Sequence, residues 1–282
     1  MEALRTLRVL QNAGRAATQA EQQVLARWGG WGAQGLSQIL DDDRAEFAGD
    51  RATLRDLLSP EDYDAARLTT INAHYTDAAL VAEIWHAVQD LGFESGRVLE
   101  PGCGSGTFIG LAPTGAELTG VELDPTTAAI AAFLYPQASI RAESFAETRF
   151  PAGHFDAVVG NVPFGNVVLH DPRYNARRLA MHNHFIVKSL ELARPGGLVA
   201  VLTSRYTMDA TNPSARRAMA ELGDLVTAVR LPSKAHWRAA GTEAVTDLLV
   251  FRRREPDRQP ADQRWIVTSP VPSGSRAVCN QR

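Results

Sequence analysis

The sequence VLEPGCGSGTFIG, residues 98–110, decides the fold. A short apolar strand predicted over 97–100 runs into a turn with glycine at every second position, Gly102, Gly104 and Gly106. Because glycine lacks a Cβ, such a turn lets a ligand approach the backbone closely. A strand, a glycine-rich turn and a following helix are typical of the first unit of an open α/β sheet. We therefore expect a ligand-binding loop at the carboxyl end of this strand.

A second strand, predicted over 118–122, ends in Glu122. This carboxylate follows Gly102 by about twenty positions, the spacing at which an acidic side chain accepts the ribose hydroxyls of a bound adenosine. Asp124 precedes a proline, as at a helix start, and is interpreted as structural. The glycine pattern G-x-G-x-G after Glu100 differs from the G-x-G-x-x-G of nicotinamide-dependent enzymes. Those enzymes are therefore the weaker alternative.

Another apolar strand, predicted over 156–160, ends in Asn161-Val162-Pro163-Phe164. The string places an amide, two residues that stiffen the backbone and an aromatic ring at a strand's carboxyl end, where ligands bind in an open parallel sheet. Hydride transfer gives no reason for such a string. The structural alternative is a turn-forming asparagine followed by a rigid proline.

Together, the two loops resemble those of S-adenosylmethionine-dependent methyltransferases that modify an exocyclic amine. Residues 100–106 match the E/D-x-G-x-G-x-G cofactor loop, and residues 161–164 match the catalytic (N/D)-P-P-(F/Y) tetrapeptide, with Val162 where proline is usual. The strings INAHYT, ELDP and GNVPFG, with LPSKAHWRAAGTEAVTDLLVF further on, resemble the methylase part of large adenine-specific DNA methylases of phages and mobile elements. The resemblance covers most of residues 1–255.

This resemblance implies an α/β fold of the Rossmann-like class I methyltransferase type. Its sheet is expected to be seven-stranded and mostly parallel, with helices on both faces. We expect an N-terminal helical lobe over 1–75, the S-adenosylmethionine-dependent methyltransferase domain over 76–255 and a tail or linker over 256–282. Trp31, with glycines around it, is a candidate for docking the lobe on the main domain, and core packing is the alternative.

The implied cofactor is S-adenosyl-L-methionine. A helix cap is an equal explanation for Thr76, and ordinary core packing for Phe145. The expected cofactor-binding residues are Tyr75, Thr76, Glu100, Pro101, Gly102, Gly104, Gly106, Thr107, Phe108, Glu122, Leu123, Glu143, Ser144, Phe145 and Asn161.

The implied reaction is direct transfer of a methyl group to the exocyclic N6 amine of adenine in DNA, with the base flipped out of the duplex. The implied catalytic residues are Asn161, Val162, Pro163 and Phe164. The Asn161 side-chain oxygen and the Val162 carbonyl would accept the two N–H bonds of the amine, and Phe164 would stack on the base.

Basic residues expected to meet the nucleic acid come from two segments. The polar stretch 165–176 is long for a loop in a compact domain, which favours a functional wall over the target base, with a solvated loop as the alternative. The segment 234–238 places cations beside an aromatic ring, which suits flipped or single-stranded nucleotides. The expected substrate-binding residues are Phe164, Arg173, Arg177, Arg178, Lys234, Trp237 and Arg238.

The composition fits a globular chain of 282 residues, with 45% hydrophobic and 22% charged residues. No apolar run approaches the ~20 residues of a membrane span, so we expect a cytoplasmic protein without a membrane partner. Two cysteines are too few for a four-ligand zinc site, and no metal is expected. Because the net charge is −3, binding to DNA would need a local basic patch.

Two further functions stay open from the sequence. Methyltransferases that act on RNA or on a protein glutamine amide share the tetrapeptide, and a non-catalytic nucleic-acid-binding or antirestriction module would keep the same fold. The resembling proteins carry a target-recognition domain or continue into a helicase-like region. We therefore expect duplex DNA as the main partner, with a separate specificity or helicase-like partner, in a restriction-modification setting.

Overall fold

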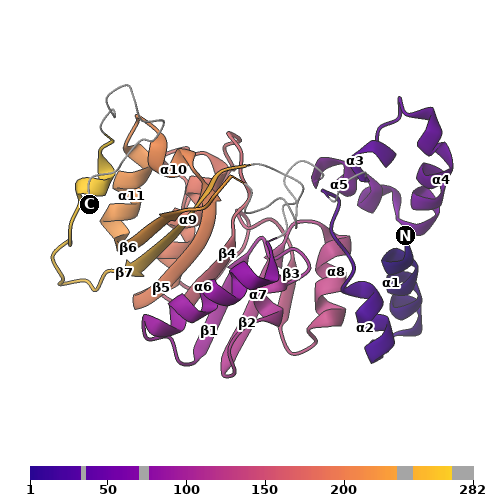
Figure 1. Cartoon of the computed structure of the whole chain (residues 1–282), viewed down its shortest axis with the longest axis horizontal. Helices are drawn as coiled ribbons and strands as arrows, with labels where there is room; N and C mark the ends of the chain where they lie inside the picture. The colour runs from indigo at the N-terminus through magenta and orange to yellow at the C-terminus, as the bar shows by residue number, and fades with distance from the viewer. Residues whose placement is uncertain (33–35, 70–75, 234–243, 269–282) are drawn as a thin grey trace.

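The computed structural model describes residues 1–32, 36–69, 76–233 and 244–268. An α/β domain with a central sheet lies beside a group of short helices from the amino-terminal part of the chain, which pack next to helix α8 (Figure 1). Within the described ranges, none of the helices combines the length and the apolar character required to cross a lipid bilayer.

The described residues form a seven-stranded sheet with the order β3-β2-β1-β4-β5-β7-β6. All neighbouring strands are parallel except β7, which is antiparallel to both β5 and β6. This arrangement confirms the predicted mostly parallel sheet. The strands are β1 (Gly96–Pro101), β2 (Ala116–Glu122), β3 (Ser139–Ala142), β4 (Phe155–Asn161), β5 (Ala193–Ser204), β6 (Gly223–Arg230) and β7 (Thr246–Arg253).

Side chains of the central strands alternate between two apolar layers. In β4, Val158 packs with the layer that contains the apolar faces of α9 and α11, whereas Ala157 and Val159 pack with the layer that contains α6. Burial of both faces explains why β4 and β5 are nearly continuous apolar runs. The helices of this domain are α6 (Ala78–Asp90), α7 (Thr107–Gly110), α8 (Pro125–Leu134), α9 (Met181–Leu192), α10 (Tyr206–Asp209), α11 (Ser214–Leu222) and η2 (Arg264–Ile266).

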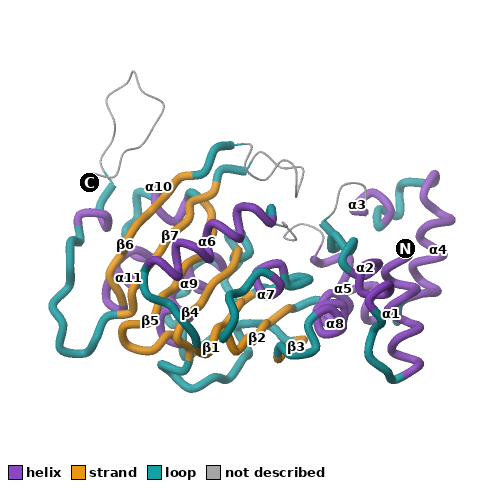
Figure 2. Tube along the Cα trace, turned by 60° about the horizontal axis from the view of Figure 1, so that its bottom comes forward, coloured by secondary structure: helices purple, strands orange, loops and turns teal. Residues whose placement is uncertain are grey.

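The amino-terminal helices share a core with α8. Leu7 and Leu10 of the first helix pack with Leu25, Leu54 and the fully buried Ile130 of α8. Helices α2 and α5 lie against α8 (Figure 2). The lobe therefore packs on the edge of the α/β domain where α8 lies. Its elements are α1 (Glu2–Ala13), α2 (Gln19–Leu25), α3 (Leu36–Ile39), η1 (Ala45–Phe47), α4 (Ala48–Leu57) and α5 (Pro60–Thr69).

The carboxyl ends of the parallel strands meet at one edge of the sheet. Strand β1 ends at Pro101, β2 at Glu122 and β4 at Asn161, so both predicted motifs begin at this edge. In an open α/β sheet this edge is where ligands bind. The fold thereby brings the two motifs to the same side of the molecule.

Candidate active site

The glycine loop connects β1 to α7 through three left-handed residues. The φ angles of Gly102, Gly104 and Gly106 are 73°, 54° and 87°, values that residues with a Cβ rarely adopt. At Gly106 a Cβ would also lie 2.7 Å from the ring of Tyr135. Gly106 thus permits close packing behind the loop, and neither it nor Pro101 is among the residues that line the cavity described next.

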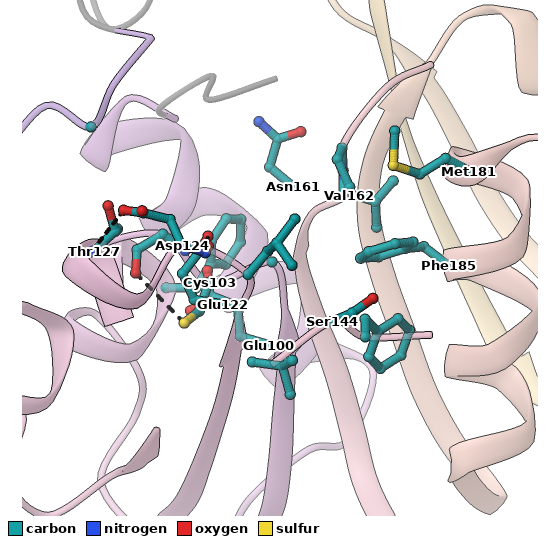
Figure 3. A pocket seen from close by; sticks show the side chains of 18 of the residues that line it. Glu100, Cys103, Glu122, Asp124, Thr127, Ser144, Asn161, Val162, Met181 and Phe185 are labelled. Carbon is teal, nitrogen blue, oxygen red and sulfur yellow. Dashed lines mark hydrogen bonds between the residues drawn. The ribbon is translucent and has the colours of Figure 1, made fainter. Parts of the chain in front are cut away.

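A cavity of about 220 Å³ lies at the carboxyl edge of the sheet (Figure 3). Asp124 and Thr127 lie on one side of it and Met181 and Phe185 on the other, with Asn161 between them. Both predicted motifs contribute to its wall. The predicted site residues that line it are Thr76, Glu100, Gly102, Gly104, Thr107, Phe108, Glu122, Leu123, Glu143, Ser144, Phe145, Asn161, Val162, Pro163 and Phe164.

Glu122 lies at the end of β2, against the glycine loop. Its Oε2 accepts a hydrogen bond from the Gly104 N–H, and its Oε1 accepts one from the Asp124 N–H, both at 2.9 Å. Burial raises the pKa of this carboxyl. A carboxylate has about four acceptor sites, so Glu122 retains acceptor capacity for a hydroxyl donor. Beside it, the apolar side chain of Leu123 is 60% exposed and lines the cavity, a surface suited to a flat heterocycle.

Glu100 is a second acidic group in the cavity wall, and it is 3% exposed. Its carboxyl accepts backbone hydrogen bonds from Ile109 and Phe108, while its Oε2 has no hydrogen-bond partner among the described residues. Burial raises the pKa of Glu100 strongly, and the charge of Glu122 adds to the effect. Two buried carboxyls with spare acceptor capacity favour a ligand that carries positive charge and hydroxyl or amine donors. S-adenosyl-L-methionine has all of these groups, so the residues fit it.

The tetrapeptide lies directly against the glycine loop. A Cβ added at Gly102 would be 3.5 Å from Cδ of Pro163, and one added at Gly160 would be 3.4 Å from Cγ of Glu100. Val162 is 1% exposed, and its backbone N–H donates to the Leu202 carbonyl at 3.0 Å, which extends the pairing of β4 with β5. Proline has no N–H to donate. The residue that departs from the family pattern therefore makes a contact that the usual residue could not make.

The wall on the α9 side contains aromatic rings. Phe145 and Phe185 have ring centroids 4.7 Å apart, and both residues line the cavity. Phe145 is also 3% exposed and belongs to the main hydrophobic core. Core packing and contact with a ligand are therefore compatible at this position.

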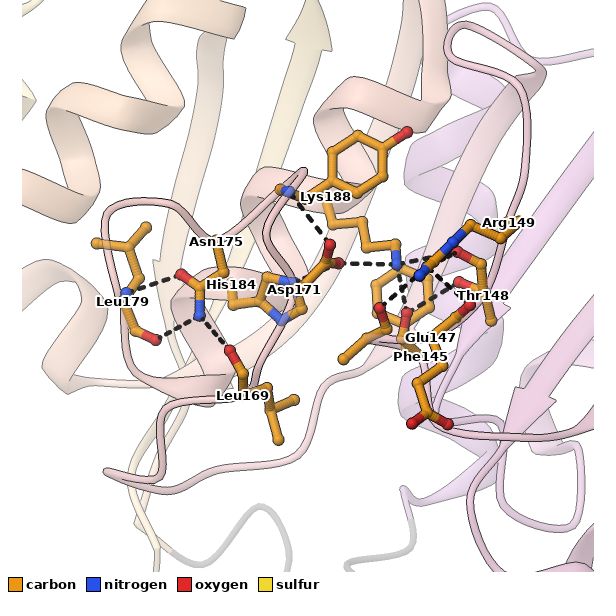
Figure 4. A network of polar contacts seen from close by, with 12 residues as sticks. Phe145, Glu147, Thr148, Arg149, Leu169, Asp171, Asn175, Leu179, His184 and Lys188 are labelled. Carbon is orange, nitrogen blue, oxygen red and sulfur yellow. Dashed lines mark hydrogen bonds and ion pairs between the residues drawn. The ribbon is translucent and has the colours of Figure 1, made fainter.

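A buried polar network holds the segment that follows the tetrapeptide (Figure 4). The Asp171 carboxylate contacts Nε2 of His184 at 3.1 Å and Nζ of Lys188 at 3.0 Å, and Lys188 also donates to the Phe145 carbonyl. Burial alone would raise the pKa of Asp171, yet the hydrogen bond and charge of Lys188 bring it below its ordinary value. Asn175 also donates to the carbonyl of the cavity residue Leu169. The solvated-loop alternative is therefore wrong at the buried Asp171 and Asn175, while most other residues of 165–176 are exposed, as it expects.

The predicted phosphate-binding arginines lie outside the cavity wall. Arg177 forms an ion pair with Glu221 at 2.7 Å. Arg178 is exposed and has a left-handed φ of 53°, and the Arg173 guanidinium lies 5.0 Å from the ring centre of Tyr174. The structure does not bring these side chains together with the tetrapeptide. Four predicted residues, Tyr75, Lys234, Trp237 and Arg238, lie outside the described residues.

The capping alternative for Thr76 is wrong. Helix α6 is capped by Asp77, whose Oδ1 accepts from the Ala79 N–H at 2.9 Å. Thr76 is instead 8% exposed and lines the cavity. Asp124 does cap α8, as predicted, because its Oδ2 accepts from the Thr127 N–H at 2.8 Å.

Several lining residues were not predicted from the sequence. Trp31 serves both roles considered for it, since it belongs to the core of the amino-terminal lobe and its indole N–H donates to Oδ2 of Asp124 at 2.8 Å, which docks the lobe on the main domain. Nothing in the sequence placed Trp31 in the site. The glycines beside it indicated docking of the lobe and not a ligand site. The cavity residues that sequence reasoning missed are Gly30, Trp31, Cys103, Val121, Asp124, Thr127, Leu169, Met181 and Phe185.

Known proteins share both the sequence pattern and the fold. Residues 99–201 match the family described as "Methyltransferase domain". The chain is 28% identical over 190 residues to "Defense against restriction protein B" of Escherichia phage P1, an alignment that covers 65% of this chain and 8% of that protein. It is 29% identical over 230 residues to "Type II methyltransferase M.XamI" of Xanthomonas campestris pv. amaranthicola, covering 71% of this chain and 42% of that protein.

A solved structure from Listeria monocytogenes, described as a class I S-adenosylmethionine-dependent methyltransferase, matches with a TM-score of 0.54 and 16% identity. The match covers 92% of this chain and 89% of that chain. This chain spans less than half the length of the two sequence relatives. It has the class I methyltransferase fold, and its residues 99–201 have the sequence pattern of a methyltransferase domain.

Proposed function

We propose that this protein transfers a methyl group from S-adenosyl-L-methionine to the exocyclic N6 amine of adenine in DNA. The observation that supports it best is the single cavity lined by the glycine loop, by Glu122 and by the whole tetrapeptide. A Cβ at Gly102 would lie in contact with Pro163, so a donor bound over the glycines would adjoin the tetrapeptide.

The carboxylates of Glu122 and Glu100 would contact different parts of the cofactor. Glu122, at the end of β2, would accept the ribose hydroxyls, and Leu123 would lie against the adenine. Glu100 would supply negative charge to a cationic ligand, because its Oε2 is a buried acceptor without a partner among the described residues. When bound, S-adenosyl-L-methionine supplies an electrophilic methyl group on a positively charged sulfur.

The tetrapeptide residues would hold and orient the target amine. The amine is a poor nucleophile because its lone pair is delocalised into the ring, and acceptance of its N–H bonds by the Asn161 side chain and the Val162 carbonyl would localise that pair. Phe164 would stack on the base, a contact worth ~1–3 kcal/mol. Placing the two reacting atoms in line would supply much of the remaining rate enhancement.

DNA is the favoured substrate because of the relatives' names. One is a type II methyltransferase and the other a protein of defence against restriction. An adenine inside a duplex must leave the stack before its amine can enter such a cavity. We further propose that a separate specificity or helicase-like partner contributes target selection.

The test is transfer of labelled methyl groups from S-adenosyl-L-methionine to duplex DNA, RNA and protein in parallel, followed by mass spectrometry of the product. N6-methyladenine in DNA is the expected result. Label in ribosomal RNA or in a glutamine amide would instead favour the second enzymatic reading. Cofactor binding without transfer to any substrate would favour a non-catalytic nucleic-acid-binding or antirestriction module.

A further inference from the structure

Two tryptophans of the amino-terminal lobe bind the first turn of α8. The Trp31 indole N–H donates to Oδ2 of Asp124 at 2.8 Å, and the Trp28 indole N–H donates to Oγ1 of Thr127 at 3.0 Å. The two indole rings meet edge to face, with centroids 4.8 Å apart. Trp31 is 1% exposed and Asp124 is 2% exposed, so the contact is fully enclosed.

A chain of hydrogen bonds continues from Trp31 to the glycine loop. Asp124 receives the indole N–H on its side chain and donates its own backbone N–H to Oε1 of Glu122. Glu122 in turn accepts the Gly104 N–H on its other oxygen. A shift of Trp31 would therefore move the segment that sets the position of the Glu122 carboxylate.

The lobe also forms part of the cavity itself. Gly30 and Trp31 line it together with Asp124 and Thr127. The second carboxylate oxygen of Asp124, Oδ1, is buried and has no hydrogen-bond partner among the described residues. Because a buried acceptor without a donor is costly, a ligand with a hydroxyl or amine donor is favoured at this end of the cavity.

Packing alone does not require this polar contact. The lobe already buries apolar side chains against Ile130 of α8, and Gln22 donates to the Phe133 carbonyl at the other end of that helix. Once buried, the Trp31 N–H needs an acceptor, and a neutral carbonyl would serve at lower cost than a carboxylate, since burial of a charge costs free energy. Because this contact lies next to Glu122, it can fix the position of the Glu122 carboxylate.

We propose that the amino-terminal lobe is a working part of the cofactor site, with Trp31 as a positioning residue that holds Asp124 and, through it, Glu122. Docking of the lobe and binding of the cofactor then stabilise each other, because coupling between two sites is reciprocal. This inference rests on the proposed function only in taking S-adenosyl-L-methionine as the ligand.

The first test compares two conservative variants by calorimetric titration with S-adenosyl-L-methionine. Trp31→Phe keeps an aromatic ring but removes the N–H donated to Asp124, and we expect about tenfold weaker binding. Trp28→Phe removes the same kind of bond from the same interface, but Trp28 does not line the cavity. We expect a change below about twofold for this control. Equal affinities of the two variants would overturn the proposal.

The second test uses the unaltered protein and needs no variant to fold. Hydrogen exchange of α1 and α2 is measured with and without S-adenosylhomocysteine, which retains the adenosine. The coupling predicts slower exchange in these helices when ligand is bound, although neither helix lines the cavity. If the protein binds ligand while exchange in both helices stays unchanged, the lobe is uncoupled and this inference fails. If it binds neither ligand, the proposed function fails instead.

Discussion

The two halves of the carboxyl edge differ in how their predicted residues are arranged. On the β1 and β2 side, Glu100, the glycine loop and Glu122 line one cavity, and the Gly104 N–H of the loop donates to Glu122. Beyond the tetrapeptide, Arg177 is paired with Glu221 and Arg178 extends from an exposed loop. The first half is built for a small ligand before any ligand arrives. In the second half the arginines lie at the surface, outside the cavity wall, where only a large partner could contact them.

This difference implies that damage to the two halves should have separable effects. Loss of a residue on the glycine-loop side should weaken binding of the cofactor without changing the rate of the transfer step. Loss of Asn161 should slow transfer without weakening cofactor binding, and loss of the exposed Arg178 should weaken only the contact with nucleic acid.

The largest effect is expected at Asn161, which faces the cavity from the end of β4 (Figure 3). Asn161→Ala removes the side-chain acceptor proposed for the amine, and we expect the single-turnover transfer rate to fall about 10²–10³-fold. The dissociation constant for S-adenosyl-L-methionine should change little. The matched control is Asn212→Ala, an exposed residue before α11 that should retain the full rate. An undiminished rate in the Asn161 variant would remove the catalytic assignment.

A smaller effect is expected at Glu122, and it should appear in cofactor binding and not in the transfer rate. In Glu122→Gln, the amide NH₂ faces an N–H donor where a carboxylate oxygen accepted one, so the Gly104 or the Asp124 N–H loses its acceptor. Together with the loss of charge, this should weaken cofactor binding about 10–100-fold. Transfer at saturating cofactor should remain near the original rate. Glu117→Gln, an exposed position in the same strand, is the control; if it weakens binding equally, Glu122 has no special role.

The same comparison explains which parts of the site could be predicted. Glu100, Glu122 and Asn161 are at strand ends, and the apolar period of a strand fixes where it ends and which edge of the sheet it reaches. The left-handed glycines follow from a tight turn. These features are local in sequence, so the sequence predicts them.

The remaining features depend on contacts between distant segments. Arg177 pairs with Glu221 and Trp31 with Asp124. The two members of each pair are far apart in the sequence, and no local pattern predicts that they meet. The use of the Val162 N–H depends on the register of β4 against β5, which no local pattern specifies. The sequence therefore shows only that Val162 departs from the family pattern, whereas the structure shows that its backbone N–H donates a hydrogen bond to Leu202.

The third prediction concerns pH and the Glu100 carboxyl. Burial raises its pKa in the unliganded protein, and a cationic ligand beside it would lower that pKa, so binding should release protons. Affinity for S-adenosyl-L-methionine should therefore rise with pH, by at most about tenfold per unit for one proton, and level off above the raised pKa. Titration in two buffers of different ionisation enthalpy measures the proton count. Glu100→Gln should abolish this linkage; proton uptake on binding would contradict the assignment.

The smallest effect is expected from the adjacent arginines of the second half. Arg177 is held by Glu221, whereas Arg178 is exposed in a left-handed conformation that non-glycine residues adopt at some cost. If Arg178 meets a phosphate, Arg178→Ala should reduce the slope of log affinity for duplex DNA against log salt by about 1. Arg177→Ala should leave the slope unchanged, because its charge is already compensated. Glu221→Ala should raise the slope by freeing Arg177, and equal slopes in all three variants would mean that this loop meets no DNA backbone.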